Sequence, residues 1–440
     1  MAETRTYVVT NNTVPAGSAL PLRIELMTEW SMASARSSES ARSWNRLDGV
    51  DLLRGLAIFF VLMNHVNIRL LSADVPYART LPKQLVSSLV WNGQRGVQIF
   101  FAVSGFLITS TTLRRWGSLS LVNVRAFYQM RFARIAPLLL ALLAILSALH
   151  FARVKHFIVP PETGGLGRAL IAALTFHVNV LEARRGYLPG NWDILWSLSV
   201  EEMFYIFFPL TCRLFGRGKL FIALLLAFVV MGPFARTLAG NGVWHEYSYL
   251  GSMDAISLGC LTALFFAKRR LPRSALVALA GSGTALLVFS LGFSRAADSW
   301  DLAGNGLDMT ILAVGTCMLI AAAAQTRWRS PRLLSPLLKL GQRSYEVYLT
   351  HMFLVFALFH LFTVVGKPMA AVPALFLFVI LLSALLGEIV ARFYSEPVNY
   401  LLRERWGDGP SRLGSVIEPA GAALRGAKMK AQPIQRIRPG

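Results

Sequence analysis

The strongest constraint in this sequence is a series of ten apolar runs, each about 20 residues long. A helix rises about 1.5 Å per residue, so about 20 residues cross the roughly 30 Å hydrocarbon core of a bilayer. Only 15% of the residues are charged, well below the roughly 25% of a soluble domain. The sequence therefore predicts an all-α, polytopic membrane protein with about ten transmembrane helices. The expected spans are 50–70, 90–112, 135–152, 194–214, 219–237, 250–267, 274–293, 307–325, 345–365 and 372–395.

The basic residues predict how these helices are oriented. The formal net charge is +21, and Lys and Arg gather in alternate loops, with five arginines in the 113–134 loop. Such loops face the cytoplasm by the positive-inside rule, which places both termini there as well. This distribution explains the positive charge better than nucleic-acid binding does. We expect a flexible cytoplasmic segment at 1–45, a membrane domain at 46–400 and a basic cytoplasmic tail at 401–440.

The segment 169–182 is apolar but short. If it crossed the membrane, every later loop would lie on the opposite side, and the basic loops would no longer all face the cytoplasm. We therefore expect a re-entrant or interfacial helix on the outer side of the membrane.

Two ionisable residues, Arg54 and His65, lie inside the first apolar run, eleven positions apart. Eleven helical steps end about 20° past three full turns, so both side chains share one face, about 16 Å apart along the axis. Ionisable residues inside a membrane are costly and commonly mark a substrate path or a reaction centre. The alternative is that Arg54, paired with Asp51, reaches toward the headgroups while His65 bonds within the bundle.

Further polar residues interrupt later runs. Arg131 and Arg134 lie one turn apart at the start of the third helix, where they can bind phosphate oxygens or simply anchor the inner face. The fourth run, NWDILWSLSVEEMFYIFFPL, contains Trp196, Glu201 and Tyr205, which suit either a sugar-binding platform or an interface belt. The sixth and ninth runs add two more candidates for substrate binding or for polar contacts in the core, Asp254 and His351.

In this order, these segments resemble the acyltransferase 3 family of integral membrane acyltransferases, from about Arg46 to Arg403. The matching pieces are Arg54 with His65, GVQIFFAVSGFLIT, Arg131 and Arg134 with Pro137, WSLSVEEMFY, MDAISLG, LGQRSYEVYLTH and the closing SEP at 395–397. One departure is Ser252, because relatives commonly carry Arg just before this Met-Asp pair.

The resemblance implies an enzyme that moves an acyl group, commonly acetyl, from cytoplasmic acyl-CoA to a hydroxyl of an extracytoplasmic or membrane-associated carbohydrate. His65 and Arg54 are then the expected catalytic residues, and Arg131 and Arg134 the expected acyl-CoA ligands. The remaining candidates would bind the acceptor or make polar contacts in the core; they are Trp196, Glu201, Tyr205, Asp254 and His351. A histidine has an ordinary pKa near 6.5, which suits a general base. No permanently bound cofactor and no metal site is expected.

The expected partners are acyl-CoA, a glycan acceptor and the lipid bilayer, and the expected location is the bacterial inner membrane. A rival hypothesis is a transporter or flippase for a lipid-linked sugar, which would also need buried charges. Matched helices broken by Gly or Pro in two halves of the chain are the usual sign of a transporter repeat, and we find none. Transfer of label from acetyl-CoA would distinguish the two.

Overall fold

The structure, a computed structural model, describes residues 47–79, 81–238, 242–293, 297, 299–326 and 328–406. All the regular structure within these residues is helical, which confirms the predicted all-α class. The expected N-terminal segment and most of the expected C-terminal tail lie outside the described residues. Helix α19 (Glu396–Arg405) crosses the expected boundary between the membrane domain, 46–400, and the tail, 401–440.

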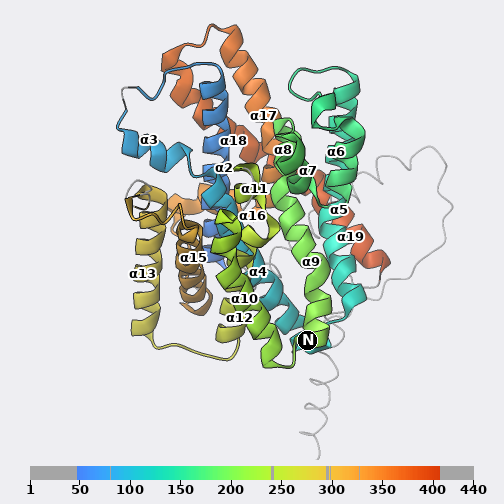
Figure 1. Cartoon of the computed structure of the whole chain (residues 1–440), viewed down its shortest axis with the longest axis vertical. Coiled ribbons are helices and arrows are strands. Elements are labelled where there is room, and N and C mark those ends of the chain that lie inside the picture. Colours follow the sequence, from blue (N-terminus) through green and yellow to red (C-terminus); the bar gives the residue numbers. More distant parts are fainter. Residues whose placement is uncertain are drawn as a thin grey trace, which may run out of the picture. The chain divides into compact units, whose positions relative to one another are not determined.

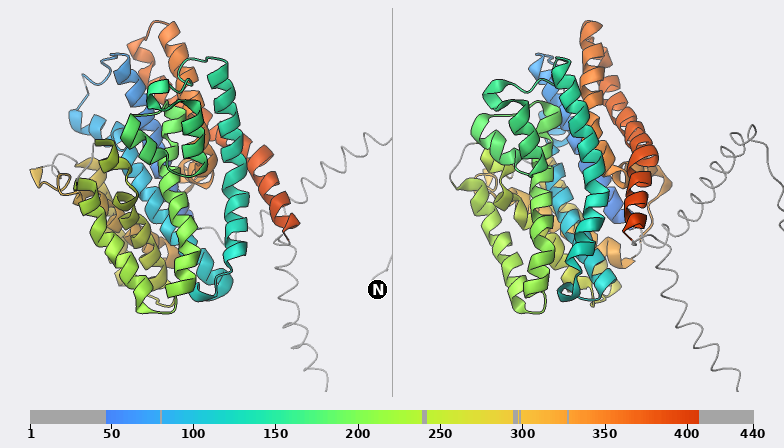
Figure 2. Two further views of the ribbon diagram at one scale, coloured as in Figure 1. Left: turned by 45° about the vertical axis from the view of Figure 1, so that its right-hand side comes forward. Right: turned by 90° about the vertical axis from the view of Figure 1, so that its right-hand side faces the viewer.

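Ten helical segments among the described residues are long and apolar enough to cross a membrane, which confirms the predicted number. Several of the predicted ends are within a few residues of the observed ones. The long helices are α2 (Asp48–Ser72), α4 (Gly93–Trp116), α5 (Val124–Phe151), α9 (Leu195–Phe215), α10 (Lys219–Thr237), α12 (Tyr249–Phe266), α13 (Arg273–Gly292), α15 (Leu307–Thr326), α17 (Ser344–Val364) and α18 (Val372–Val390). Figures 1 and 2 show their arrangement.

Helix α5 differs most from the expected span, because it begins at Val124 rather than at 135. The side chain of Asn123 caps it by accepting a hydrogen bond from the amide of Ala126, at 3.0 Å. Pro137 lies inside the helix and does not end it. Arg131 and Arg134 therefore belong to the second and third turns of a helix rather than to a loop.

The expected helix at 169–182 is in fact two short helices, α6 (Gly165–Leu174) and α7 (Val178–Arg185). The chain turns between them at Phe176, whose φ of 57° cannot continue a right-handed helix. Neither helix is long enough to cross a bilayer. The short helix α8 (Gly190–Asp193) then leads into α9.

Close helix crossings hold the bundle together around α2 and α4. A Cβ on Gly96 would lie only 2.6 Å from the carbonyl oxygen of Ala57 on α2. One on Gly105 would overlap the carbonyl of Ile256 on α12. Both glycines therefore have a packing role, since only a residue without a side chain permits these approaches.

Shorter helices complete the bundle. They are α3 (Lys83–Val90), α11 (Gly242–Tyr247) and α16 (Ser335–Gln342), and α16 packs against α2. All three cysteines of the sequence are buried thiols.

Candidate functional site

Helix α2 presents Arg54 and His65 on one face, as its periodicity predicted. The guanidinium of Arg54 donates to the carboxylate of Asp51 at 3.4 Å, which confirms the expected pairing one turn apart. Both Arg54 and His65 are half-buried. The stripe therefore lies inside the bundle while keeping some access to small molecules.

His65 meets a second histidine from a distant part of the chain. Its ring centroid lies 5.0 Å from that of His351 on α17, with the planes at 66°. Nδ1 of His65 bonds the carbonyl oxygen of Val61 at 2.8 Å, and Nδ1 of His351 bonds that of Tyr348 at 2.6 Å. A carbonyl oxygen only accepts, so each Nδ1 carries a hydrogen, and Nε2 of each neutral ring is left with its lone pair.

The two histidines differ in access. His351 is 0% exposed and its Nε2 has no hydrogen-bond partner, whereas His65 is half-buried. Tyr348, whose ring lies 5.8 Å from that of His351, donates a hydrogen bond to the carbonyl of Ile194 at 2.9 Å. This bond ties α17 to the segment that leads into α9. His65 is therefore the histidine that a substrate can reach.

A group of arginines lies toward the Asp48 end of α2. The guanidinium of Arg131 lies 4.0 Å from the ring centroid of Tyr205, a cation–π contact. Arg134 lies 3.9 Å from the buried carboxylate of Glu346. Arg54 is close enough to Arg134, Glu346 and Glu201 to interact with their charges. Three arginines from α2 and α5 thus gather at one end of the stripe.

Glu201 and Tyr205 belong to this arginine group rather than to the surroundings of Trp196. Tyr205 donates its hydroxyl hydrogen to Glu201, and the hydroxyl of Ser104 donates to the same carboxylate at 2.5 Å. Trp196 and Glu201 are five positions apart, which places them about 140° apart around α9 and about 7.5 Å apart along it. The structure therefore separates residues that the sequence grouped around one acceptor.

Trp196 lies within the bundle and not in an interface belt. It is 4% exposed, and its ring stacks on that of Tyr247 with centroids 4.1 Å apart and planes at 5°. Trp192 is fully buried as well. The hydroxyl of Tyr247 donates to the carboxylate of Asp193 at 3.2 Å. The stack of Trp196 on Tyr247 thus positions the tyrosine hydroxyl that bonds to the Asp193 carboxylate.

Asp254 has a complete set of protein partners. Arg236 on α10 contacts both of its oxygens, at 3.1 and 2.9 Å. The amide of Gln98 donates at 3.0 Å and the hydroxyl of Thr310 at 2.5 Å. Asp254 is 0% exposed. Of the two roles that the sequence left open, the geometry therefore favours the structural one, joining four helices.

Comparison with known proteins identifies the family. A family model described as an acyltransferase domain, that of acyltransferase 3, matches residues 47–388, which is most of the chain. The chain belongs to the acyltransferase 3 family. It is similar to the O-acetyltransferase OatA of Staphylococcus aureus strains NCTC 8325 / PS 47 and COL, with 26% identity over 382 residues. The match covers 80% of this chain and 57% of each relative, so the chain spans less than two thirds of their length. No solved structure matches.

Several residues that shape the polar interior of the bundle could not be identified from the sequence. Arg236 is one, although a buried Asp254 in an apolar run requires a cation somewhere in the bundle. The cation that pairs with Asp254 comes from α10 and not from the neighbouring residues of α12. Tyr247 and Asp193 carry no comparable signal, because only the packing of α11 against the segment formed by α8 and the start of α9 brings them together.

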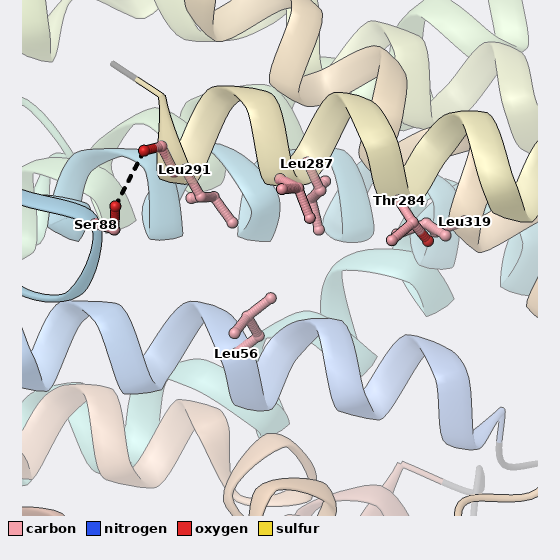
Figure 3. A pocket seen from close by; sticks show the side chains of 8 residues that line it. Leu56, Ser88, Thr284, Leu287, Leu291 and Leu319 are labelled. Carbon is pink, nitrogen blue, oxygen red and sulfur yellow. Dashed lines mark hydrogen bonds between the residues drawn. The ribbon is translucent and has the colours of Figure 1, made fainter. Parts of the chain in front are cut away.

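An apolar groove on the other side of α2 is distinct from this site (Figure 3). It has a volume of about 280 Å³ and lies between α2, α3, α13 and α15. Leu56, which faces it, is two residues from Arg54 and so about 200° around the helix. The groove therefore faces away from the stripe that contains Arg54 and His65. Its lining residues are Leu56, Ser88, Thr284, Leu287, Val288, Leu291, Gly292 and Leu319.

Proposed function

We propose that this acyltransferase moves an acyl group, which we expect to be acetyl, from cytoplasmic acyl-CoA to a hydroxyl group of a carbohydrate. The acceptor is extracytoplasmic or membrane-associated, and the membrane is the inner membrane of a bacterium. Family membership and the similarity to proteins named O-acetyltransferase support the reaction type. The basic loops support the orientation, with the Asp48 end of α2 toward the cytoplasm.

The donor binds at the Asp48 end in this proposal. Arg131 and Arg134 bind phosphate groups of acyl-CoA, because a guanidinium donates two parallel hydrogen bonds to neighbouring phosphate oxygens. Arg54 holds the donor further along α2. The remaining distance to His65, part of a stripe of about 16 Å, is spanned by the extended arm that ends in the thioester.

His65 acts as the general base. Its Nε2 takes the proton of an acceptor hydroxyl while the hydroxyl oxygen attacks the thioester carbon. The bond from carbon to sulfur then breaks, the ester forms, and the imidazolium returns its proton to the departing thiolate. A base of this kind contributes about 10²–10⁴ in rate. The thioester is already activated, so the step needs no side-chain nucleophile.

One observation carries this proposal. His65 is half-buried, its Nδ1–H is bonded to a backbone carbonyl, and its Nε2 is left with a lone pair on the same face of α2 as Arg54. A base must present an unprotonated nitrogen to the hydroxyl that it deprotonates, and this geometry supplies one.

The test is transfer of radiolabel from acetyl-CoA by the purified chain in lipid nanodiscs, with cell-envelope glycans of the producing strain as acceptor. We expect label in an alkali-labile ester of the carbohydrate and an equal amount of released CoA. Glycan translocation without any labelled ester would refute the proposal and favour the transporter. Membranes from cells that lack the chain are the control.

A further inference from the structure

The far end of the α2 stripe contains a second polar group. Arg69 follows His65 by four residues, so it lies on nearly the same face about 6 Å further along. Its guanidinium lies 5.2 Å from the ring centroid of Phe356 on α17. Arg69 also interacts with the charge of Asp193 on α8. The stripe thus runs from the arginine group through the histidines to Asp193.

Helix α8 packs against α17 just beyond the second histidine. A Cβ on Gly190 would lie 2.5 Å from Cε of Met352, the residue after His351, and 3.2 Å from the ring of Phe356. Helix α8 contacts both α17 and α9, near which it lies in Figure 1. Asp193 is therefore held close to the path that leads to His65.

Unpartnered buried polar atoms concentrate around α8. Asn191 is 0% exposed, and neither its amide nitrogen nor its amide oxygen has a hydrogen-bond partner. The indole nitrogen of Trp192 and Oε2 of Glu182, both in fully buried residues, are likewise unpartnered. Buried polar atoms are normally satisfied, so several such atoms on neighbouring segments indicate a site for a polar ligand. The Asp254 cluster shows the contrast, because its carboxylate is fully bonded.

Glu182 and Asp193 form a pair of carboxyl groups. Oε1 of Glu182 accepts from the amide of Leu188 at 3.0 Å, and the side chain is close enough to Asp193 for the two carboxyl groups to interact electrostatically. Burial and the neighbouring Asp193 raise the pKa of Glu182 well above its ordinary value. Glu182 is therefore the member of the pair that favours the protonated form, which leaves the negative charge to Asp193. Asp193 is the accessible member of the pair, since it is half-buried while Glu182 is 0% exposed.

We propose that Asp193, backed by Glu182 and Asn191, binds two neighbouring hydroxyl groups of the sugar acceptor and presents one of them to His65. A carboxylate accepts hydrogen bonds from hydroxyl donors, and the Asn191 amide can both donate and accept. Tyr247 is a positioning residue, because it donates to Asp193 and is itself held by its stack on Trp196. This inference rests on the proposed function and assigns the acceptor end of its site.

The test measures transfer kinetics of Asp193→Asn and Glu182→Gln in nanodiscs, with envelope glycans of the producing strain as the acceptor. Both changes nearly preserve shape. We expect the KM for the glycan to rise about tenfold or more with Asp193→Asn, as for a lost hydrogen bond to a charged group. The KM for acetyl-CoA should stay within about twofold. Glu246→Gln, which alters an exposed carboxylate beside Tyr247, is the matched control and should behave as wild type.

Two results would overturn the inference. One is an unchanged glycan KM in Asp193→Asn, and the other is an equal rise in both KM values. Tyr247→Phe adds a second measurement, because it removes only the hydrogen bond to Asp193 and should raise the glycan KM by a smaller factor. A wild-type chain that transfers no label refutes the proposed function itself, so the two failures are distinguishable.

Discussion

The buried Asp254 cluster yields a prediction that separates a structural role from substrate binding. Arg236→Met removes the cation and leaves the Asp254 carboxylate buried, with only Gln98 and Thr310 as donors from other side chains. Breaking one side of a buried ion pair costs about 3–5 kcal/mol, because the remaining charge is uncompensated. Asp254→Asn should cost less, since Arg236 keeps its hydrogen bonds to the carbonyl of Gly306, at 2.7 and 3.1 Å.

The assay is thermal unfolding in nanodiscs, followed by intrinsic tryptophan fluorescence. At about 2 °C per kcal/mol for a large domain, Arg236→Met should lower the melting temperature by roughly 5–10 °C. The double variant with Asp254→Asn should be more stable than Arg236→Met alone, because it removes the stranded charge. Both KM values of the folded fraction should remain close to wild type. A raised glycan KM with an unchanged melting temperature would refute this reasoning and make Asp254 a substrate ligand.

Three further predictions concern the donor end, the carboxyl pair and the helix crossings. Arg131→Gln should raise the KM for acetyl-CoA about tenfold or more in steady-state kinetics. Arg125→Gln, which changes an exposed residue on the same helix, should leave that KM unchanged. Equal increases in both variants would contradict the assignment of Arg131 to donor binding. Because the pKa of Glu182 is raised, the folded chain retains a proton that the unfolded chain loses above about pH 4.5. The Glu182 contribution to stability should therefore be fully present below that pH and be lost as pH rises toward the folded value. Glu182→Gln should remove this part of the pH dependence, and identical changes in melting temperature with pH for the variant and wild type would count against a protonated Glu182. Gly105→Ala should lower the melting temperature by several degrees, because its Cβ would overlap a carbonyl of α12. Gly281→Ala, whose Cβ would face open space, should leave the melting temperature unchanged. Similar melting temperatures for the two variants would show that the crossing at Gly105 tolerates a side chain.

Features that depend on one helix could be predicted from the sequence. The spacing of Arg54 and His65 predicted a shared face, because helical geometry relates residues along one chain segment without knowledge of the fold. The number of long helices followed from apolar run lengths in the same way. The start of α5 did not, because its first three turns include charged residues that lower the local hydropathy and therefore resemble a loop.

Features that join distant segments could not be predicted. The contact of His65 with His351 links α2 to α17, and nothing in either segment indicates which helix is its neighbour. The same holds for Asp254, whose partner comes from α10. Glu201 was expected beside Trp196 because they are close in sequence, yet their angular separation on α9 places them in different surroundings. Sequence patterns identify polar residues that need partners, and packing decides the partners.

The central claim is that Nε2 of His65 removes the acceptor proton, and a single-turnover measurement tests it most directly. His65→Ala, preloaded with labelled acetyl-CoA and mixed with glycan, should transfer label about 10²–10⁴-fold more slowly than wild type while binding acetyl-CoA normally. His360→Ala, which changes an exposed histidine on α17, should transfer at the wild-type rate. A His65→Ala chain that is correctly inserted and transfers label at the wild-type rate would contradict the account.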